Sequence, residues 1–232
     1  MAEETFPVTG IILKVTPVLD YDRRIEVLTF ERGRLAAFVR GARRPKSKLL
    51  GTTEQFCFGT FHLRDTGNAF TVTEADVREY FEGLRTDLDK VYSAMYFAEL
   101  CRALSRENAD NAELAKLLFV ALRALEKGKA DLKLIRSAFV LRALIAEGNG
   151  IDAEPGKAYA AGTKDAVAHL KGAEVSAVFG FAVSDRVLSE LHSLSGYNLN
   201  RIVGYSLPGE EILNELMGEA ENGKIPGMEQ IP

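Results

Sequence analysis

The chain has few cysteines and no long apolar segment. Its two cysteines, Cys57 and Cys101, lie far apart in the sequence and lack a neighbouring Cys or His at metal-ligand spacing. Neither a disulfide framework nor a zinc site is indicated, so we expect reduced, buried thiols. No apolar run approaches the roughly 20 residues that a membrane-spanning helix needs, and the acidic start at residues 1–4 is unlike a secretory signal. We therefore expect a cytoplasmic protein without a membrane partner.

Signatures of catalysis are missing as well. Three Gly-Lys pairs begin at Gly128, Gly156 and Gly223, but none continues with the Ser or Thr that a phosphate-binding loop requires. The three histidines are isolated from cysteine and from one another, and no nucleophile elbow or His-Glu metal helix is present. The sequence predicts a non-enzymatic protein with no cofactor and no metal.

What the sequence does contain is a concentrated positive segment. From Arg32 to Lys48 there is no acidic residue, although the net charge of the whole chain is −4. Residues 1–80 hold 12 basic against 11 acidic residues, and the remainder holds 17 against 22, so the basic character is confined to the first third. The basic residues of the segment are Arg32, Arg34, Arg40, Arg43, Arg44, Lys46 and Lys48. Such a segment indicates a polyanionic partner, because each cation placed on a phosphate displaces condensed counterions.

The first third of the chain has the pattern of β-structure. Short segments rich in β-branched and aromatic residues are separated by turn-forming residues. These segments are residues 8–15, 25–30, 35–40, 56–63 and 69–73. Hairpin turns are expected at residues 31–34 and 65–68, and five strands is the number found in an OB-fold barrel.

After Asp76 the apolar residues follow a helical period. Helices are predicted at residues 88–104, 114–125, 132–146, 184–194 and 210–217, whereas 149–172 is interrupted by glycines. The fold class is therefore α+β, with an N-terminal five-stranded OB-fold β-barrel followed by a mainly α-helical part. We assign residues 1–80 to a nucleic-acid-binding barrel and 81–148 to a helical bundle. Residues 149–232 form a mostly helical region without zinc ligands that packs on the bundle.

The third predicted strand determines which side chains of the basic segment share a face. Since alternate residues of a strand share a face, Leu35, Ala37 and Val39 suit the barrel core. The opposite face then carries Arg34, Phe38 and Arg40, which place an aromatic ring between two guanidinium groups. This arrangement is suited to stacking a base while holding its flanking phosphates.

Other cations near this strand vary in how well they fit a binding role. The loop residues Arg43, Arg44, Lys46 and Lys48 extend the phosphate track. Arg23 and Arg24 are lesser candidates, because Asp20, Asp22 and Glu26 lie beside them and explain them nearly as well by ion pairing. For Phe38 the alternative is packing beneath the loop or against the helical part.

Residues 41–47 have the sequence Gly-Ala-Arg-Arg-Pro-Lys-Ser, and an earlier segment has the sequence Asp20-Tyr21-Asp22-Arg23. The first segment resembles the most recognisable run of the RecO family of bacterial recombination mediators, and the second is similar to that family's first hairpin. Residues 134–144 are similar to its Arg/Phe/Leu helix. Many family members carry a four-cysteine zinc site after the third main helix, and no cysteine follows Gly148 here. The resemblance is therefore to the zinc-free type.

The resemblance implies a function and partners. It implies a protein of DNA repair and homologous recombination that binds single- and double-stranded DNA without sequence specificity, promotes strand annealing and helps to load a RecA-class recombinase. It implies RecR as a partner and association with the nucleoid when bound to DNA. It also implies a helical pocket for the acidic, apolar C-terminal tail of the single-strand-binding protein. Arg136 is the first candidate for that pocket, with Arg123 and Phe139 as further ones.

Two other functions stay open from the sequence. One is an OB-fold RNA-binding protein of translation or ribosome assembly, and the other is a phosphodiester hydrolase whose dispersed carboxylates converge only in the fold. Arg102, Arg123 and Arg142 each lie near a predicted helix C-terminus, where a cation interacts favourably with the helix dipole. We prefer that explanation for these three residues to a binding role.

Overall fold

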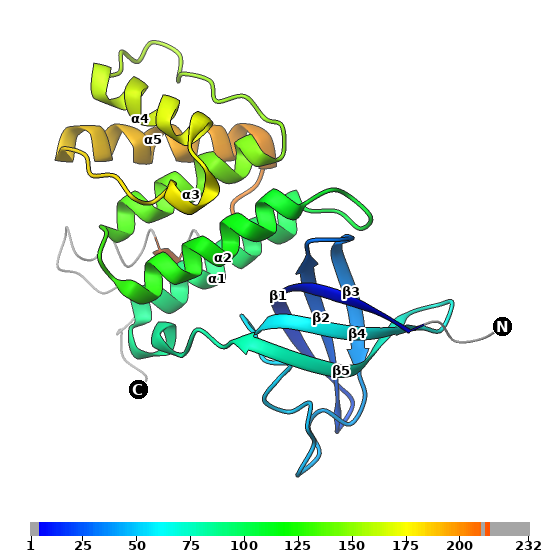
Figure 1. Cartoon of the computed structure of the whole chain (residues 1–232). Helices are drawn as coiled ribbons and strands as arrows, with labels where there is room; N and C mark the ends of the chain where they lie inside the picture. Colours follow the sequence, from blue (N-terminus) through cyan, green and yellow to red (C-terminus); the bar gives the residue numbers. More distant parts are fainter. Residues whose placement is uncertain (1–4, 210–211, 214–232) are drawn as a thin grey trace, which may run out of the picture.

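The protein is a β-barrel joined to a layered set of helices (Figure 1). The structure is a computed structural model, and it describes residues 5–209 and 212–213. No helix in this part of the chain is both long and apolar enough to cross a membrane. The predicted α+β class and five-stranded barrel are confirmed.

The barrel is closed by five strands in the order β1-β2-β3-β5-β4. They are β1 (Thr5–Val18), β2 (Asp22–Thr29), β3 (Gly33–Val39), β4 (Phe58–Asp65) and β5 (Phe70–Glu79). All neighbours pair antiparallel except β3 and β5, whose short parallel contact at Ala37↔Phe70 and Phe38↔Thr71 closes the barrel. The two predicted hairpins, β2–β3 and β4–β5, are present.

A short 3-10 turn, η1 (Glu82–Thr86), leads from the barrel to the helices. These are α1 (Leu88–Leu104), α2 (Ala112–Lys127), α3 (Leu132–Ala146), α4 (Ala161–Gly172) and α5 (Asp185–Val203), with a second turn η2 (Val175–Ala177). Helix α4 was not predicted, because its sequence is rich in small residues and contains Gly162. The helix predicted from Glu210 to Met217 lies outside the described residues except for Ile212 and Leu213.

Helix α3 is the centre of the helical part. It contacts α1, α2, α4 and α5, and its residues are buried almost all round the helix, as expected of a helix with neighbours on every side. Cys101 is buried in the same helical core, and Cys57 is buried in the barrel core. Both are free thiols, and burial raises the pKa of each.

An apolar junction connects the barrel to the helices. Ile11, Leu13 and Leu28 belong to the barrel strands but are buried in the helical core. Rings continue this contact, since Phe58 of β4 lies 4.7 Å from Phe119 of α2, measured between ring centroids. The helices therefore pack against apolar residues of β1, β2 and β4, while the barrel interior forms a separate core.

Backbone hydrogen bonds tie the β2–β3 hairpin to the loop between α1 and α2. The Arg34 amide donates to the Arg106 carbonyl at 3.1 Å, and the Asn108 amide donates to the Arg32 carbonyl at 3.0 Å. Gly33 lies between these bonds with φ +65°. A Cβ atom at this position would approach the Arg106 carbonyl oxygen to 2.3 Å, so the close approach requires glycine.

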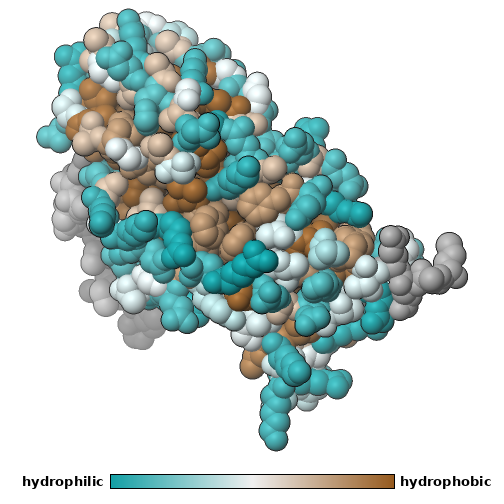
Figure 2. Space-filling view, viewed as in Figure 1, coloured by the Kyte–Doolittle hydropathy of each residue, from teal (hydrophilic) through white to brown (hydrophobic). Residues whose placement is uncertain are grey.

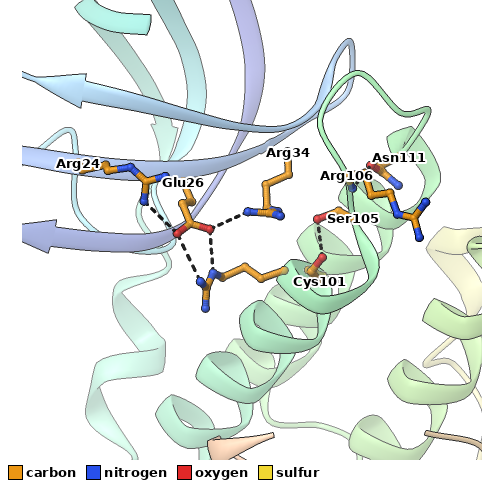
Figure 3. A network of polar contacts seen from close by, with 8 residues as sticks. Arg24, Glu26, Arg34, Cys101, Ser105, Arg106 and Asn111 are labelled. Atoms are coloured by element: carbon orange, nitrogen blue, oxygen red, sulfur yellow. Dashed lines mark hydrogen bonds and ion pairs between the residues drawn. The ribbon is translucent and has the colours of Figure 1, made fainter. Parts of the chain in front are cut away.

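An ionic contact adds to the same junction (Figure 3). Glu26 of β2 is only 5% exposed and accepts from Arg102 of α1 at 2.9 Å, from Arg34 of β3 at 3.0 Å and from Arg24 at 3.4 Å. We call Arg24, Arg34 and Arg102 the arginine cluster. Burial on its own would raise the pKa of Glu26, but the hydrogen bond from Arg102 and the charges of the arginine cluster outweigh it, so that this pKa is lowered.

We predict that Gly33→Ala lowers the free energy of unfolding by about 2–4 kcal/mol, because the methyl group adds a clash to the strain of a left-handed conformation. Gly67→Ala is the matched control, since Gly67 also has positive φ but nothing lies within 4 Å of the position that its added methyl group would take. The control should lose about 1–2 kcal/mol. Urea unfolding measures both, and equal losses would contradict the close approach at Gly33.

We predict that Glu26→Gln destabilises the protein at neutral pH by about 2–3 kcal/mol, because it leaves partly buried guanidinium groups without their anion. A carboxyl whose pKa is lowered on folding stabilises the fold above its unfolded pKa, about 4.3 for glutamate. This contribution is lost as the pH falls through the folded value. The stability difference between wild type and Glu26→Gln should therefore narrow between pH 7 and pH 3 in urea titrations. A difference that does not vary with pH would show that the charge of Glu26 is not what stabilises the junction.

Candidate nucleic-acid interface

The outer face of β2 and β3 carries the predicted site residues. Leu35, Ala37 and Val39 are buried in the barrel core, whereas Arg34, Phe38 and Arg40 lie on the outside. The predicted alternation along this strand is confirmed. Arg24 of β2 pairs in register with Phe38, which places it on the same face.

The part of this face farthest from the helices has unpaired cations. Arg40, Arg43, Arg44, Lys46 and Lys48 are all exposed. Within residues 5–209 and 212–213, none of them forms an ion pair with a carboxylate. We call these five side chains the loop cations. The β3–β4 loop projects from the end of the barrel away from the helices (Figure 1), where the space-filling view shows a hydrophilic projection (Figure 2).

The β3–β4 loop is held in place by the neighbouring β1–β2 hairpin. The Gly41 amide donates to Asp22 Oδ1 at 2.7 Å, and the Arg43 amide donates to the Tyr21 carbonyl at 2.9 Å. The Arg44 guanidinium lies 5.5 Å from the Tyr21 ring centroid, within the range of a cation–π contact. The cations thus project from an anchored backbone, and the exposed Tyr21 lies among them.

Arg23 has a structural role that the sequence did not predict. Its Nη1 donates to the Leu50 carbonyl at 2.9 Å, and its Nη2 pairs with Glu54 at 2.8 Å. Its side chain is only 12% exposed. Arg23 therefore anchors the far end of the β3–β4 loop, and we remove it from the nucleic-acid contacts.

The part of the face nearest the helices is occupied by the arginine cluster. Arg24 and Arg34 both contact Glu26. Ion pairing of Arg24 with Glu26 was one of the two explanations that the sequence analysis left open for Arg24. The ion pair of Arg34 was not predicted. The third member, Arg102, comes from α1, and the helix dipole alone does not account for its position. No local pattern pointed to this contact, because 76 residues separate Arg102 from Glu26.

An open pocket of about 350 Å³ lies above Phe38, between the two halves of the face. Its lining combines aromatic rings with carboxylates and an amide. The lining residues are Arg24, Ala36, Phe38, Asp65, Gly67, Asn68, Ala69, Phe70 and Glu107. Phe38 is thus half-exposed at an open surface and is not covered by the helical part. In OB-folds, this strand face together with the β1–β2 and β4–β5 loops is where oligonucleotides bind.

The predicted partner-binding residues lie in a different environment. Phe139 is fully buried and its ring stacks on Phe97 at 3.9 Å between centroids, so it offers no surface to a partner. Arg123 pairs with both Glu79 and Glu126 at the barrel junction. Neither residue supports the predicted tail pocket.

Arg136 is 8% exposed, and its Nε donates to Ser93 Oγ at 2.8 Å. Burial lowers the pKa of Arg136, while Asp89 and Asp131 act in the opposite direction. Burial also lowers the pKa of His192, and the nearby charges of Lys133 and Arg136 lower it further. Arg136 therefore lies among charges of both signs, Asp89 and Asp131 on one side and Lys133 on the other.

A groove of about 760 Å³ lies between the barrel and the helices. Its floor includes Phe30, Phe58 and Phe119, but its charged lining residues are balanced, with as many acidic as basic side chains. It has no electrostatic preference for an anion. Among the residues with described positions, no group of three or more His, Cys, Asp and Glu side chains is arranged to hold a metal.

Comparison with known proteins agrees with this architecture. The sequence model described as "Recombination protein O N terminal" matches residues 1–81, which include the whole barrel. The model described as "Recombination protein O C terminal" matches residues 85–154, which include α1 to α3.

Curated relatives carry the name "DNA repair protein RecO". The chain is 31% identical over 150 residues to the protein of Clostridium novyi (strain NT), which covers 64% of this chain and 58% of the relative. It is 35% identical over 142 residues to that of Anaeromyxobacter sp. (strain K), with 60% and 56% covered. The chain spans somewhat more than half the length of these relatives. Because the two family models match most of its length, including every barrel strand, the chain belongs to the RecO family.

Proposed function

We propose that the chain is a non-enzymatic mediator of DNA repair and homologous recombination. It binds single- and double-stranded DNA without sequence specificity, through the loop cations and the pocket above Phe38. The observation that carries this proposal is the group of five exposed cations without carboxylate partners among the described residues. Cations on a loop contact the sugar-phosphate backbone, which carries no sequence information.

The mechanism is electrostatic and mechanical. Cations that neutralise phosphates lower the repulsion between two strands, which lets complementary strands anneal. An aromatic platform such as Phe38 stacks any base, because every base has a π-face. With RecR as a partner, the same contacts help a RecA-class recombinase to reach DNA that is coated by single-strand-binding protein. The chain would act in the cytoplasm, associated with the nucleoid.

The helical part would recognise the coating protein. An acidic tail with apolar last residues needs a guanidinium for its carboxylate and an apolar surface beside it. The positive charges of Arg136 and Lys133, which both act on His192, support this location. Since most of Arg136 is buried, the carboxylate would contact the remaining exposed edge of its guanidinium.

Replacing Arg43, Arg44, Lys46 and Lys48 together by Ala should weaken binding of oligothymidylate. It should also flatten the dependence of the logarithm of affinity on the logarithm of salt, by about 0.7 for each lost phosphate contact on a single strand. Fluorescence anisotropy at several salt concentrations measures both quantities. The matched control replaces four exposed cations of the helical part, Lys127, Lys129, Lys164 and Arg186, and should leave both unchanged. Equal behaviour of the two quadruple variants would refute the assignment.

Competition distinguishes the RNA-binding alternative at the same site. At fixed salt, single-stranded DNA should displace labelled oligothymidylate at least as well as RNA of the same length. Displacement by RNA at much lower concentration would favour a function in translation or ribosome assembly.

Arg136→Gln should weaken binding of a synthetic acidic peptide with apolar C-terminal residues by about tenfold, because it removes a charge-assisted hydrogen bond. Its DNA affinity should stay at the wild-type value. Arg201→Gln is the control, since Arg201 lies on α5 and pairs with Asp152. Isothermal titration calorimetry measures the peptide, and wild-type peptide affinity of Arg136→Gln would remove Arg136 from the site.

A further inference from the structure

We propose that the arginine cluster is a phosphodiester-binding site at the junction of barrel and helices. Through it, a nucleic-acid strand held by the loop cations continues along β2 and β3 onto α1. This inference rests on the proposed function and extends it, because it gives the strand a path between the two parts of the molecule.

The positive and negative charges of the arginine cluster are not balanced. Three guanidinium groups surround one carboxylate, Glu26, which leaves two positive charges uncompensated. Arg123 provides a contrast, because it has two carboxylate partners, Glu79 and Glu126. Together with Glu26, the arginine cluster therefore has a net positive charge.

The arginine side chains of the cluster are more exposed to solvent than the carboxylate that they contact. The side chains of Arg24, Arg34 and Arg102 are 43%, 32% and 30% exposed, whereas that of Glu26 is only 6% exposed. The anion therefore lies beneath the cations, and solvent meets guanidinium groups. An exposed phosphate approaching this surface would encounter donors before it encountered the carboxylate.

The arginine cluster has unused hydrogen-bonding capacity. Each guanidinium carries several N–H donors in a planar fork, and Glu26 accepts from one or two nitrogen atoms of each arginine. Arg34 Nε is itself buried, so it is not among the donors that a phosphate from solvent could reach. Guanidinium forks bind phosphate oxygens through paired N–H bonds, so a phosphate can use the donors that remain.

The arginine cluster is continuous with the proposed site. Arg34 and Phe38 lie on the outer face of β3, and Arg40 directly follows this strand. Arg34 and Arg40 are about 20 Å apart at the rise of an extended strand. The pocket between them contains the carboxylates Asp65 and Glu107, which repel phosphate but accept hydrogen bonds from base amino groups. The chemistry therefore places phosphates at both ends of the face and a base in the middle.

The test measures oligothymidylate binding by anisotropy with Arg102→Gln and with Arg24→Gln. The second variant disturbs the fold least, because the contact from Arg24 to Glu26 is the longest in the cluster, 3.4 Å, and Arg34 and Arg102 still hold the carboxylate. Each variant should bind roughly three- to tenfold more weakly and lower the salt slope by about 0.7. Arg186→Gln, on an arginine of α5 that is 74% exposed and pairs with Glu190, should change neither quantity.

Thermal unfolding of each variant is measured alongside binding. If Arg102→Gln is unfolded, the DNA affinity of Arg24→Gln decides the test. If both folded variants bind like Arg186→Gln while the quadruple loop variant loses affinity, the arginine cluster is not a phosphate site and the proposed function stands. If the loop variant also binds like wild type, the proposed function itself has failed.

Discussion

The contact between Glu26 and three arginines orders the surface that we propose binds nucleic acid. Its carboxylate lies beneath guanidinium groups that come from β2, β3 and α1, and it therefore joins the barrel to the helices. Ile11, Leu13 and Leu28 are buried against the helices at the same junction. The ionic contact holds three guanidinium groups close together at one edge of this junction.

The same contact divides the outer face of β2 and β3 into two kinds of surface. Toward the helices, the cations are gathered around a carboxylate and fixed in orientation. Toward the free end of the barrel, the loop cations have no carboxylate partner among the described residues, and all five are exposed. Between them lies a pocket in which an aromatic ring and carboxylates suit a base better than a phosphate. A strand of nucleic acid has both kinds of group, and the face offers a place for each.

Local sequence patterns predicted the parts of the fold that depend on nearby residues. The alternation of Leu35, Ala37 and Val39 with Arg34 and Phe38 predicted which side of β3 is buried, and helical periodicity predicted α3 with the bounds that the structure has. Such patterns could not predict contacts between segments that are far apart in the sequence. Arg102 was explained by the dipole of its own helix, although its partner is on β2.

Two further residues show the same limit. Arg23 was weighed against its near neighbours Asp20 and Asp22, whereas its partner is Glu54 at the far end of a loop. Phe139 was recognised as part of an apolar helix face, but periodicity does not distinguish a partner surface from a core. Only the packing of Phe139 on Phe97 from α1 decides this.

Ultraviolet cross-linking of oligothymidylate to the full chain, followed by mass spectrometric mapping of the linked peptides, would locate the bound strand on the protein. We expect cross-links to the aromatic residues Phe38 and Tyr21, within peptides that cover residues 19–48. Cross-links confined to residues 112–203 would contradict this expectation, because the strand would then lie on the helices and not on the outer face of β2 and β3.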